Sequence, residues 1–481
     1  MQPTTATTQK GFKPSFNLLD ATMIVAGSMI GSGIFLVSAD MTRTVGSAGW
    51  LILLWVITGV LTLIAALSYG ELSAMFPKAG GQYVYLKEAY NPLIAFLFGW
   101  SFFAVIQTGT IAAVGVAFSK FAAYIFPVLS ENHILADLGF IKISAAQITS
   151  IVLILFLTWV NTRGVKEGKF IQTLFTLTKL VALFGLIIFG FIKAGGAIWN
   201  ENWSTGFAFG KSDGNAIVPY TGAAAIGAFA GAMVGSLFSS DSWNNVTFIA
   251  GEIENPKRNI GLSLFLGTLI VTLIYVSTNL MYLAVLPMQG IAHAENDRVG
   301  VEAAKLIFGS TGTTIIAVML MVSTFGCNNG LILSGARVYY TMAKDGLFFS
   351  AAGHLNKNAV PSKGLWIQCM WASVLCLSGR YGDLLDYIIF TVLIFYILTI
   401  AGIFILRRKR PDIPRPYKAF GYPVLPMLYI IAAGIICVSL LIYKPKFTFP
   451  GLLIVLLGIP IYYLFGRNRH VIEEAPRNGE S

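Results

Sequence analysis

Charged residues are scarce in this chain of 481 residues, of which 11% are Asp, Glu, Lys or Arg and 56% are hydrophobic. A soluble globular domain carries roughly 25% charged residues. The composition therefore excludes an ordinary soluble protein and indicates an integral membrane protein with many spans. No loop between the apolar runs is long enough for a soluble domain, so we expect no appended enzyme.

Cysteine and histidine are also rare, with four of each. The cysteines all lie in apolar segments, so they predict no extracellular disulfide framework. The histidines fall in predicted loops or in the C-terminal tail. No His-Asp-Ser grouping and no cluster of metal ligands is present, and we expect no enzyme activity, no cofactor and no metal. A channel is not indicated, because no filter sequence or repeated charged ring appears.

Acidic residues number 22 against 33 Lys and Arg, a net charge of +11. If both termini are cytoplasmic, the expected span boundaries put 21 of those 33 basic residues on the cytoplasmic side and 9 outside. The other three, Lys120, Lys179 and Arg337, fall inside spans. This asymmetry follows the positive-inside rule and predicts orientation in a plasma or bacterial inner membrane. It predicts no nucleic-acid partner.

The chain is rich in apolar runs of the length that crosses a bilayer as a helix. We expect twelve spans, near residues 18–41, 49–76, 93–126, 145–161, 170–192, 219–252, 261–287, 313–342, 364–379, 384–406, 422–442 and 449–466. The third and eighth are long, which indicates tilt or extension beyond the bilayer. The first follows a polar tail without a cleavage site, and is expected to be a retained helix and not a signal peptide.

Glycine interrupts the first span at residues 27–35, GSMIGSGIF. Glycine is the poorest helix former after proline, and backbone freed from helical pairing cannot face lipid. A broken helix near the midplane is the best sequence pointer to a transporter's substrate site. The alternative is that Gly27 and Gly31 form a GxxxG pair that lets two helices pack closely.

Five motifs in order resemble the amino acid–polyamine–organocation superfamily of permeases. The first is GSGIF, within residues 27–35, and the second is FPKAGGQYVY at 76–85. The others are GEIENPKRN at 251–259, ARVYYTMAKDG at 336–346 and RRKRPDIPRPY at 407–417. Each motif is weak alone, but together they extend the resemblance over nearly the whole chain.

This resemblance implies an all-α membrane fold of the LeuT type with twelve transmembrane helices. Residues 18–192 and 219–406 would form two inverted five-helix repeats, followed by two helices at 422–466. Residues 1–17 and 467–481 would be cytoplasmic tails. The sixth span echoes the first, since GAMVGS at 231–236 resembles GSMIGS at 27–32. Interrupted first and sixth spans are what this architecture requires.

In the first span, Gly31, Ser32 and Gly33 are expected to expose backbone N–H groups. Such groups at a half-helix N-terminus suit a substrate carboxylate. Carbonyl groups near Met29 and Ile30 would suit a substrate ammonium. The resemblance implies both roles, because members of the superfamily bind the amino acid backbone in this way.

The sixth span is expected to break around Phe238, Ser239, Ser240, Asp241 and Ser242, where polar residues cluster in apolar surroundings. By resemblance, Phe238 would be an aromatic gate over the substrate; the alternative is that it only packs. The following Trp-Asn pair matches L-type relatives.

Asp241 departs from the L-type pattern, which has a small neutral residue at this position. A carboxylate at mid-membrane depth is costly and is a functional candidate by default. It could pair with the substrate ammonium, carry a proton or only hydrogen-bond the broken backbone.

Lys179 lies near the centre of the fifth span, about ten residues or roughly 15 Å from either end. Its side chain is too short to reach water, whereas Lys120 is near enough to the outer interface to do so. In sodium-independent relatives a lysine here takes the place of a bound ion and braces the broken first span against the eighth. The resemblance thus implies that Lys179, with Asn328 on the eighth span, is the coupling or structural cation site.

The expected function is sodium-independent transport of amino acids by alternating access, as an exchanger of neutral amino acids of the L-type branch. The alternative is a proton-coupled symporter of amino acids or amines. Expected partners are the amino acid substrate and the bilayer. Eukaryotic L-type relatives join a heavy chain by a disulfide from the loop between spans three and four. Here that loop, about 127–144, has no cysteine, so no disulfide-linked heavy chain is expected.

Overall fold

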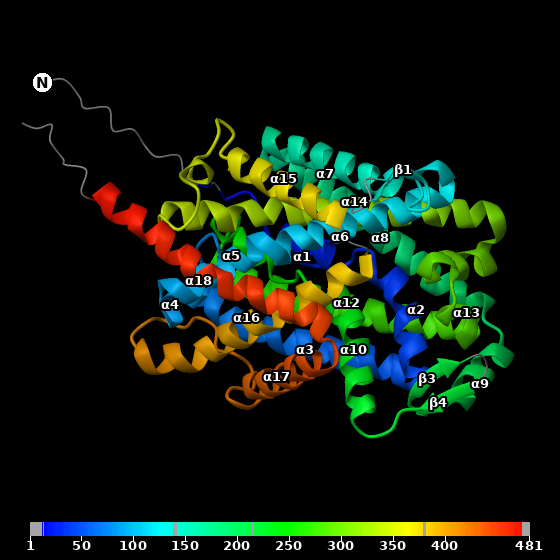
Figure 1. Cartoon of the computed structure of the whole chain (residues 1–481). Helices are drawn as coiled ribbons and strands as arrows, with labels where there is room; N and C mark the ends of the chain where they lie inside the picture. Colours follow the sequence, from blue (N-terminus) through cyan, green and yellow to red (C-terminus); the bar gives the residue numbers. More distant parts are fainter. Residues whose placement is uncertain (1–11, 13, 138–141, 214–215, 379–380, 474–481) are drawn as a thin grey trace, which may run out of the picture.

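The computed structural model describes residues 12, 14–137, 142–213, 216–378 and 381–473. The parts of the two expected tails at 1–11, 13 and 474–481 lie outside the described residues. Figure 1 shows a bundle of long helices that run roughly in one direction, with α1 beginning and α18 ending at the same end of the bundle. We call this the tail end.

The helices of the first half follow the apolar runs closely. They are α1 (Leu18–Met29), α2 (Gly33–Val45), α3 (Ala48–Met75), α4 (Gln82–Ala89), α5 (Pro92–Ser101), α6 (Gln107–Ile125), α7 (Ala145–Arg163), α8 (Val165–Lys193) and α9 (Gly196–Ser204). A short π-helix, Phe102–Ile106, joins α5 to α6, and a 3-10 turn, Pro127–Leu129, follows α6. The expected third span is therefore a continuous helical segment with one wide turn.

The helices of the second half are α10 (Ala223–Ser239), α11 (Asn245–Phe248), α12 (Pro256–Val285), α13 (Met288–Ala292), α14 (Val299–Lys344), α15 (Ser362–Ser378), α16 (Tyr381–Lys409), α17 (Val424–Tyr443) and α18 (Pro445–Glu473). Three 3-10 turns lie between them, at Ala250–Glu252, Glu295–Asp297 and Ser350–Gly353. Helix α14 is kinked at Gly309, which has a positive φ of 71°. Its segment after the kink corresponds to the expected eighth span.

The expected all-α membrane fold is confirmed, and two small hairpins lie in the loops between helices. Strands β1 (Ile134–Asp137) and β2 (Lys142–Ser144) pair antiparallel, as do β3 (Gly210–Asp213) and β4 (Ala216–Pro219).

The expected sixth span at 219–252 was wrong in its bounds. Residue 219 ends β4, and the helix begins only at Ala223, after Gly222 with a φ of 52°.

Nine helical segments of the described chain are long and apolar enough to cross a membrane. They coincide with the expected spans one to five, seven, eight, ten and eleven. The sixth and twelfth correspond to shorter apolar helices, at Ala223–Ser239 and Thr448–Leu464, and the ninth corresponds to α15, Ser362–Ser378. A multi-pass helical membrane protein is therefore confirmed, while the count of twelve and the repeat boundaries stay predictions.

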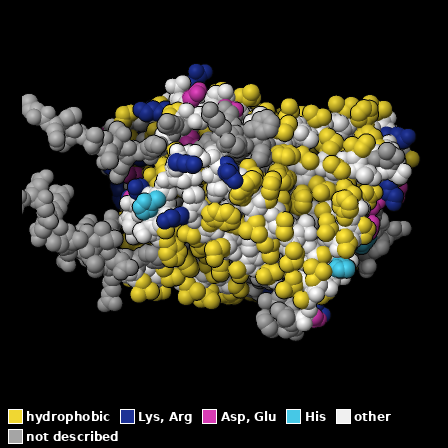
Figure 2. Space-filling model, turned by 90° about the horizontal axis from the view of Figure 1, so that it is seen from above, with side chains coloured by type: hydrophobic (Ala, Val, Ile, Leu, Met, Phe, Trp, Pro, Cys, Tyr) yellow, Lys and Arg dark blue, Asp and Glu magenta, His cyan; other side chains and the backbone are white. Residues whose placement is uncertain are grey.

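The surface agrees with a membrane setting. Figure 2 shows hydrophobic side chains over most of the long face between the two ends, with Lys and Arg side chains mainly toward the ends. Inside the bundle, α12 packs along α3 and α1, while α14 packs against α6 and α8 and α10 packs against α2. The interrupted helices of the first and sixth spans are thus enclosed by other helices.

Candidate functional site

The first span is interrupted where the sequence predicted. Helix α1 ends at Met29, Ile30 leaves the helical conformation with ψ 89°, and α2 begins at Gly33. Residues 29–33 are all buried, with exposed fractions of 3% or less where a value is given. Within the described chain, the N–H groups of Gly31 and Gly33 have no hydrogen-bond acceptor. These N–H groups therefore remain available at the start of α2.

The sixth span breaks within its polar cluster, as the sequence predicted. Helix α10 ends at Ser239, and Ser242 adopts a left-handed φ of 65° before α11 starts at Asn245. Two freed carbonyl groups remain capped by local N–H groups. The N–H of Ser240 donates to Ser236 O at 3.0 Å and that of Asp241 donates to Phe238 O at 3.2 Å.

The two breaks lie against each other. A Cβ added to Gly33 would overlap the side chain of Ser239, so only glycine allows this approach. The Tyr275 hydroxyl, from α12, lies 2.9 Å from both Met29 O and Ser239 O, so its single proton can be donated to either carbonyl group or shared between them. Sequence reasoning missed Tyr275, because one tyrosine in an apolar span has the same pattern as a core residue.

Lys179 reaches the first break from α8. Its side chain is fully buried, and Nζ donates to Gly27 O at 2.5 Å and to Ile30 O at 2.6 Å. The expected contact of Lys179 with the broken first span is therefore confirmed. Carbonyl oxygens are acceptors only, so the lysine is the donor in both contacts. In its protonated form it supplies a fixed positive charge at this point. Its role in place of an ion stays a prediction.

Helix α14 contributes to the same break through Cys327. The thiol donates to Ser28 O at 3.1 Å, and a Cβ on Gly31 would lie 2.9 Å from its sulfur. Asn328, the expected partner of Lys179, lies elsewhere. Its buried amide lies beside Gly115 of α6. In the described part of the chain this amide has no hydrogen-bond partner.

Asp241 faces away from the first break. Its Oδ1 accepts a 2.6 Å hydrogen bond from the Tyr396 hydroxyl of α16. Tyr69, Trp243 and Tyr396 form one aromatic cluster, with ring centroids 4.7 to 5.9 Å apart. No ion pair to Asp241 is found among the residues that the structure describes. The sequence singled out this carboxylate as a candidate, but it gave no signal for its partner Tyr396, which lies 155 positions later.

Two small cavities flank Asp241. One of about 10 Å³ lies toward Gln82, Gln107 and Asn244, and one of about 20 Å³ lies toward Thr62, Ser240 and Tyr429. Each has room for about one water molecule. Neither could hold an amino acid, so a substrate would require the surrounding helices to move.

The motif stretches meet at the tail end. The carboxylate of Glu252 accepts from Arg337 Nε at 2.9 Å, and both side chains are buried, with exposed fractions of 1% and 0%. The backbone oxygen of Glu252 accepts from the N–H groups of Ser15 and Phe16. The segment before α1 is thereby tied to the 3-10 turn after α11.

A second contact closes the same end. Asp345 accepts from the Tyr83 hydroxyl at 2.8 Å and from Lys87 Nζ at 2.7 Å. Tyr83 and Asp345 belong to the second and fourth motif stretches, and Lys87 follows the second. Deeper in the bundle, Gln82 accepts from Asn244 at 3.0 Å. The motifs therefore join the sixth, second and eighth spans on one side of the breaks.

The sequence-predicted residues form a site only in part. Met29, Ile30, Gly31, Gly33 and Ser239 come together at the facing breaks. The carbonyl oxygens of Met29 and Ile30 already accept from Tyr275 and Lys179. A substrate ammonium would share those oxygens, each of which has two lone pairs.

The other sixth-span residues lie beside the breaks. Phe238 is 7% exposed, while Ser240 and Ser242 line the small cavities with Asp241. No group of three or more His, Cys, Asp or Glu in the described chain could hold a metal.

Two interrupted helices that face each other inside a many-helix membrane bundle define a transporter of small solutes. The sequence profile described as "Amino acid permease" matches residues 16–465, and the chain belongs to this family. The superfamily expected from the motifs is thereby confirmed. Members of the family are transporters, not enzymes.

Similar proteins are found in bacteria and in animals. The chain is 31% identical to the serine/threonine exchanger SteT of Bacillus subtilis over 460 residues, 95% of this chain and 98% of the relative. It is 29% identical to the large neutral amino acids transporter small subunit 2 of Mus musculus over 456 residues, 94% and 81% of the two chains. It is 28% identical to the b(0,+)-type amino acid transporter 1 of Homo sapiens over 472 residues, 96% and 89% of the two chains.

Proposed function

We propose that this protein is a sodium-independent exchanger of neutral amino acids that works by alternating access. The observation that carries the proposal is the position of the Lys179 ammonium between Gly27 O and Ile30 O. A fixed cation at the break removes the need for a bound sodium ion there. The names of the relatives support the substrate class, since one is a serine/threonine exchanger and another transports large neutral amino acids.

The substrate carboxylate would bind the free N–H groups of Gly31 and Gly33, together with Ser32. Helix N-termini favour anions at such positions. The substrate ammonium would bind the carbonyl groups of Met29 and Ile30 and those near Phe238. Phe238 would cover the substrate as a gate, and Ser239, Ser240 and Ser242 would line the path that opens when α10 moves.

A second candidate function is proton-coupled transport of amino acids or amines, which Asp241 favours. Its carboxylate is buried and hydrogen-bonded to Tyr396 without an ion-pair partner in the described residues. Such a group can gain or lose a proton as the transporter changes conformation. Exchange without protons is the first choice because Lys179, not Asp241, contacts the first break.

We also propose that the protein acts as a single chain in the plasma or bacterial inner membrane, with both termini cytoplasmic. The positive-inside rule supports this orientation, since the expected span boundaries put 21 of the 33 Lys and Arg on the cytoplasmic side. The loop from about 127 to 144 contains no cysteine that could bind a heavy chain.

The deciding experiment is uptake into liposomes that contain the purified protein, with serine, threonine, alanine, leucine, arginine, glutamate and putrescine as labelled substrates. Each is tested with and without unlabelled amino acid inside, in sodium and in choline buffer. We expect neutral substrates to enter only preloaded vesicles, at equal rates in the two buffers.

Three outcomes would contradict this proposal. Uptake into empty vesicles driven by an imposed pH gradient would favour proton symport. Loss of uptake in choline would show sodium coupling. Preference for putrescine, arginine or glutamate would overturn the assignment to neutral substrates but not transport itself.

A further inference from the structure

An apolar groove of about 740 Å³ lies at the tail end, away from the two breaks. Its walls are Leu67 of α3, Leu262 and Phe265 of α12, and Phe420 in the segment before α17. Leu67 lies eight residues before the end of α3, about 12 Å along the helix axis. The groove therefore extends from the end of the bundle into its apolar belt.

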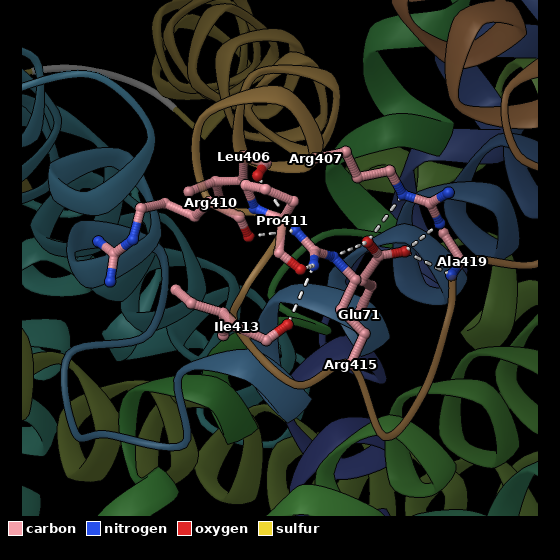
Figure 3. A network of polar contacts seen from close by, with 8 residues as sticks. All are labelled: Glu71, Leu406, Arg407, Arg410, Pro411, Ile413, Arg415 and Ala419. Atoms are coloured by element: carbon pink, nitrogen blue, oxygen red, sulfur yellow. Dashed lines mark hydrogen bonds and ion pairs between the residues drawn. The ribbon is translucent and has the colours of Figure 1, made fainter.

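The far wall of the groove is held rigidly. Glu71 accepts from Arg407 at 2.7 and 3.0 Å and from Ala419 N–H at 2.7 Å, and Arg415 Nε lies 3.5 Å from it (Figure 3). The Tyr417 ring packs on Gly70, where an added Cβ would be 2.8 Å from a ring carbon. Segment 416–420 is thus held against α3 by an ion pair, a backbone hydrogen bond and ring packing.

Three cations border this groove: Lys257 and Arg258 in the first turn of α12, and Lys418 opposite them. All three are exposed, and within the described chain none has a side-chain hydrogen bond or ion pair. Glu254, the nearest acidic residue along the chain, pairs with neither Lys257 nor Arg258 in the structure. Arg407 and Arg415 differ, because both pair with Glu71, which compensates one of their two positive charges.

The position of Lys257 and Arg258 is unfavourable by itself. They lie at the positive end of the helix dipole, where anions are stabilised and cations are not. The N-cap residue, Asn255, makes no side-chain capping hydrogen bond. An anion bound between the three side chains would relieve this repulsion, and helix N-termini are well suited to phosphate groups.

We propose that this groove is a binding site for one anionic phospholipid. Its phosphate and headgroup would lie among Lys257, Arg258 and Lys418, and one acyl chain would fill the apolar groove. A basic pocket between membrane helices with an adjoining apolar surface is the combination that selects such lipids. A sterol fits less well, because it lacks the negative charge that the three cations would bind.

The test is native mass spectrometry of the full-length protein in detergent, titrated with dioleoylphosphatidylglycerol or dioleoylphosphatidylcholine. The first variant is Lys257→Gln/Arg258→Gln/Lys418→Gln. Its matched control is Lys78→Gln/Lys357→Gln/Lys363→Gln, which removes three exposed charges from the same end. A separate variant, Phe420→Ser, alters a side chain that is 68% exposed, so it should fold normally.

We expect phosphatidylglycerol to bind more tightly than phosphatidylcholine. The groove triple should weaken it about a hundredfold, because each basic residue near an anionic lipid contributes roughly fivefold. The control triple should bind as wild type, and Phe420→Ser should weaken both lipids.

Equal binding of the two lipids, or equal loss in the control triple, would overturn the proposal. Competition by glycerol 3-phosphate at equal concentration would show a site for free phosphate and would also overturn it. The result does not depend on what the protein transports.

Discussion

The Lys179 ammonium on α8 lies 2.5 Å from the carbonyl oxygen of Gly27 on α1. It fastens the interrupted helix to a neighbour at the point where that helix loses its own hydrogen bonds. A Cβ on Gly27 would overlap Gln172 and Thr176 of α8, so the two helices approach as closely as a glycine permits. Gly27 therefore allows close helix packing, as the GxxxG interpretation requires, and its carbonyl group also accepts a hydrogen bond from Lys179.

Lys179→Ala should lower exchange about tenfold or more, since removing one partner leaves buried polar groups uncompensated at a cost of several kcal/mol. Folding, checked by size-exclusion chromatography, should survive. Lys120→Ala is the matched control, because this lysine lies near the end of α6. Wild-type uptake should be the same in sodium and choline. A fully active Lys179→Ala variant would contradict the account.

Asp241→Asn and Tyr396→Phe should each reduce exchange, and the double variant should be no worse than either single variant. The two side chains share one short hydrogen bond, and a bond to a charged group contributes about 1.5–3 kcal/mol. A double-mutant cycle on uptake rates measures the coupling.

The pH dependence of the same variants separates the remaining roles of Asp241. We expect Asp241→Asn to keep the wild-type pH profile and the wild-type KM. A flattened profile would identify Asp241 as a proton carrier. A raised KM with the profile retained would show that it pairs with the substrate ammonium.

Tyr275→Phe should slow exchange roughly fivefold, the effect of losing about 1 kcal/mol of hydrogen bonding. The hydroxyl contacts Met29 O and Ser239 O at once, so its loss uncouples the two breaks while the ring still packs on Trp55. Tyr340→Phe, at a more exposed site, is the control. An unchanged rate would show that the bridge has no part in transport.

Glu252→Gln should lower the free energy of unfolding by about 3 kcal/mol or more, because it leaves the buried Arg337 without a counter-ion. Glu252→Met/Arg337→Met should recover most of the loss, since neither charge then remains. Glu254 is exposed, so the control substitution Glu254→Gln should change the free energy of unfolding by at most about 0.5 kcal/mol. Thermal unfolding in detergent measures all three. A double variant as unstable as the single one would argue against a charge effect.

Transport should need no second chain. All four cysteines are buried in the structure, so none is available for a disulfide to a partner. Purified protein should run as a single species on a non-reducing gel, and liposomes containing it alone should exchange amino acids. Strict dependence on a co-purifying subunit would refute this expectation.

The sequence by itself determined the membrane class, the family and the location of both breaks. These properties depend on local features that are visible in the amino-acid sequence: long apolar runs, glycine and polar clusters inside them, and motifs in order. Lys179 was identified in the same way, because a lysine in the middle of a span has no solvent to reach.

Only the tertiary structure decided which groups meet. Tyr275 and Tyr396 are ordinary aromatic residues in apolar helices, and their hydroxyl partners lie 246 and 155 positions away in sequence. Asn328 was expected beside Lys179, yet helix rotation gives that place to its neighbour Cys327. One position along a helix turns a side chain by about 100°, which the spacing of apolar residues does not resolve when a helix is buried on every side.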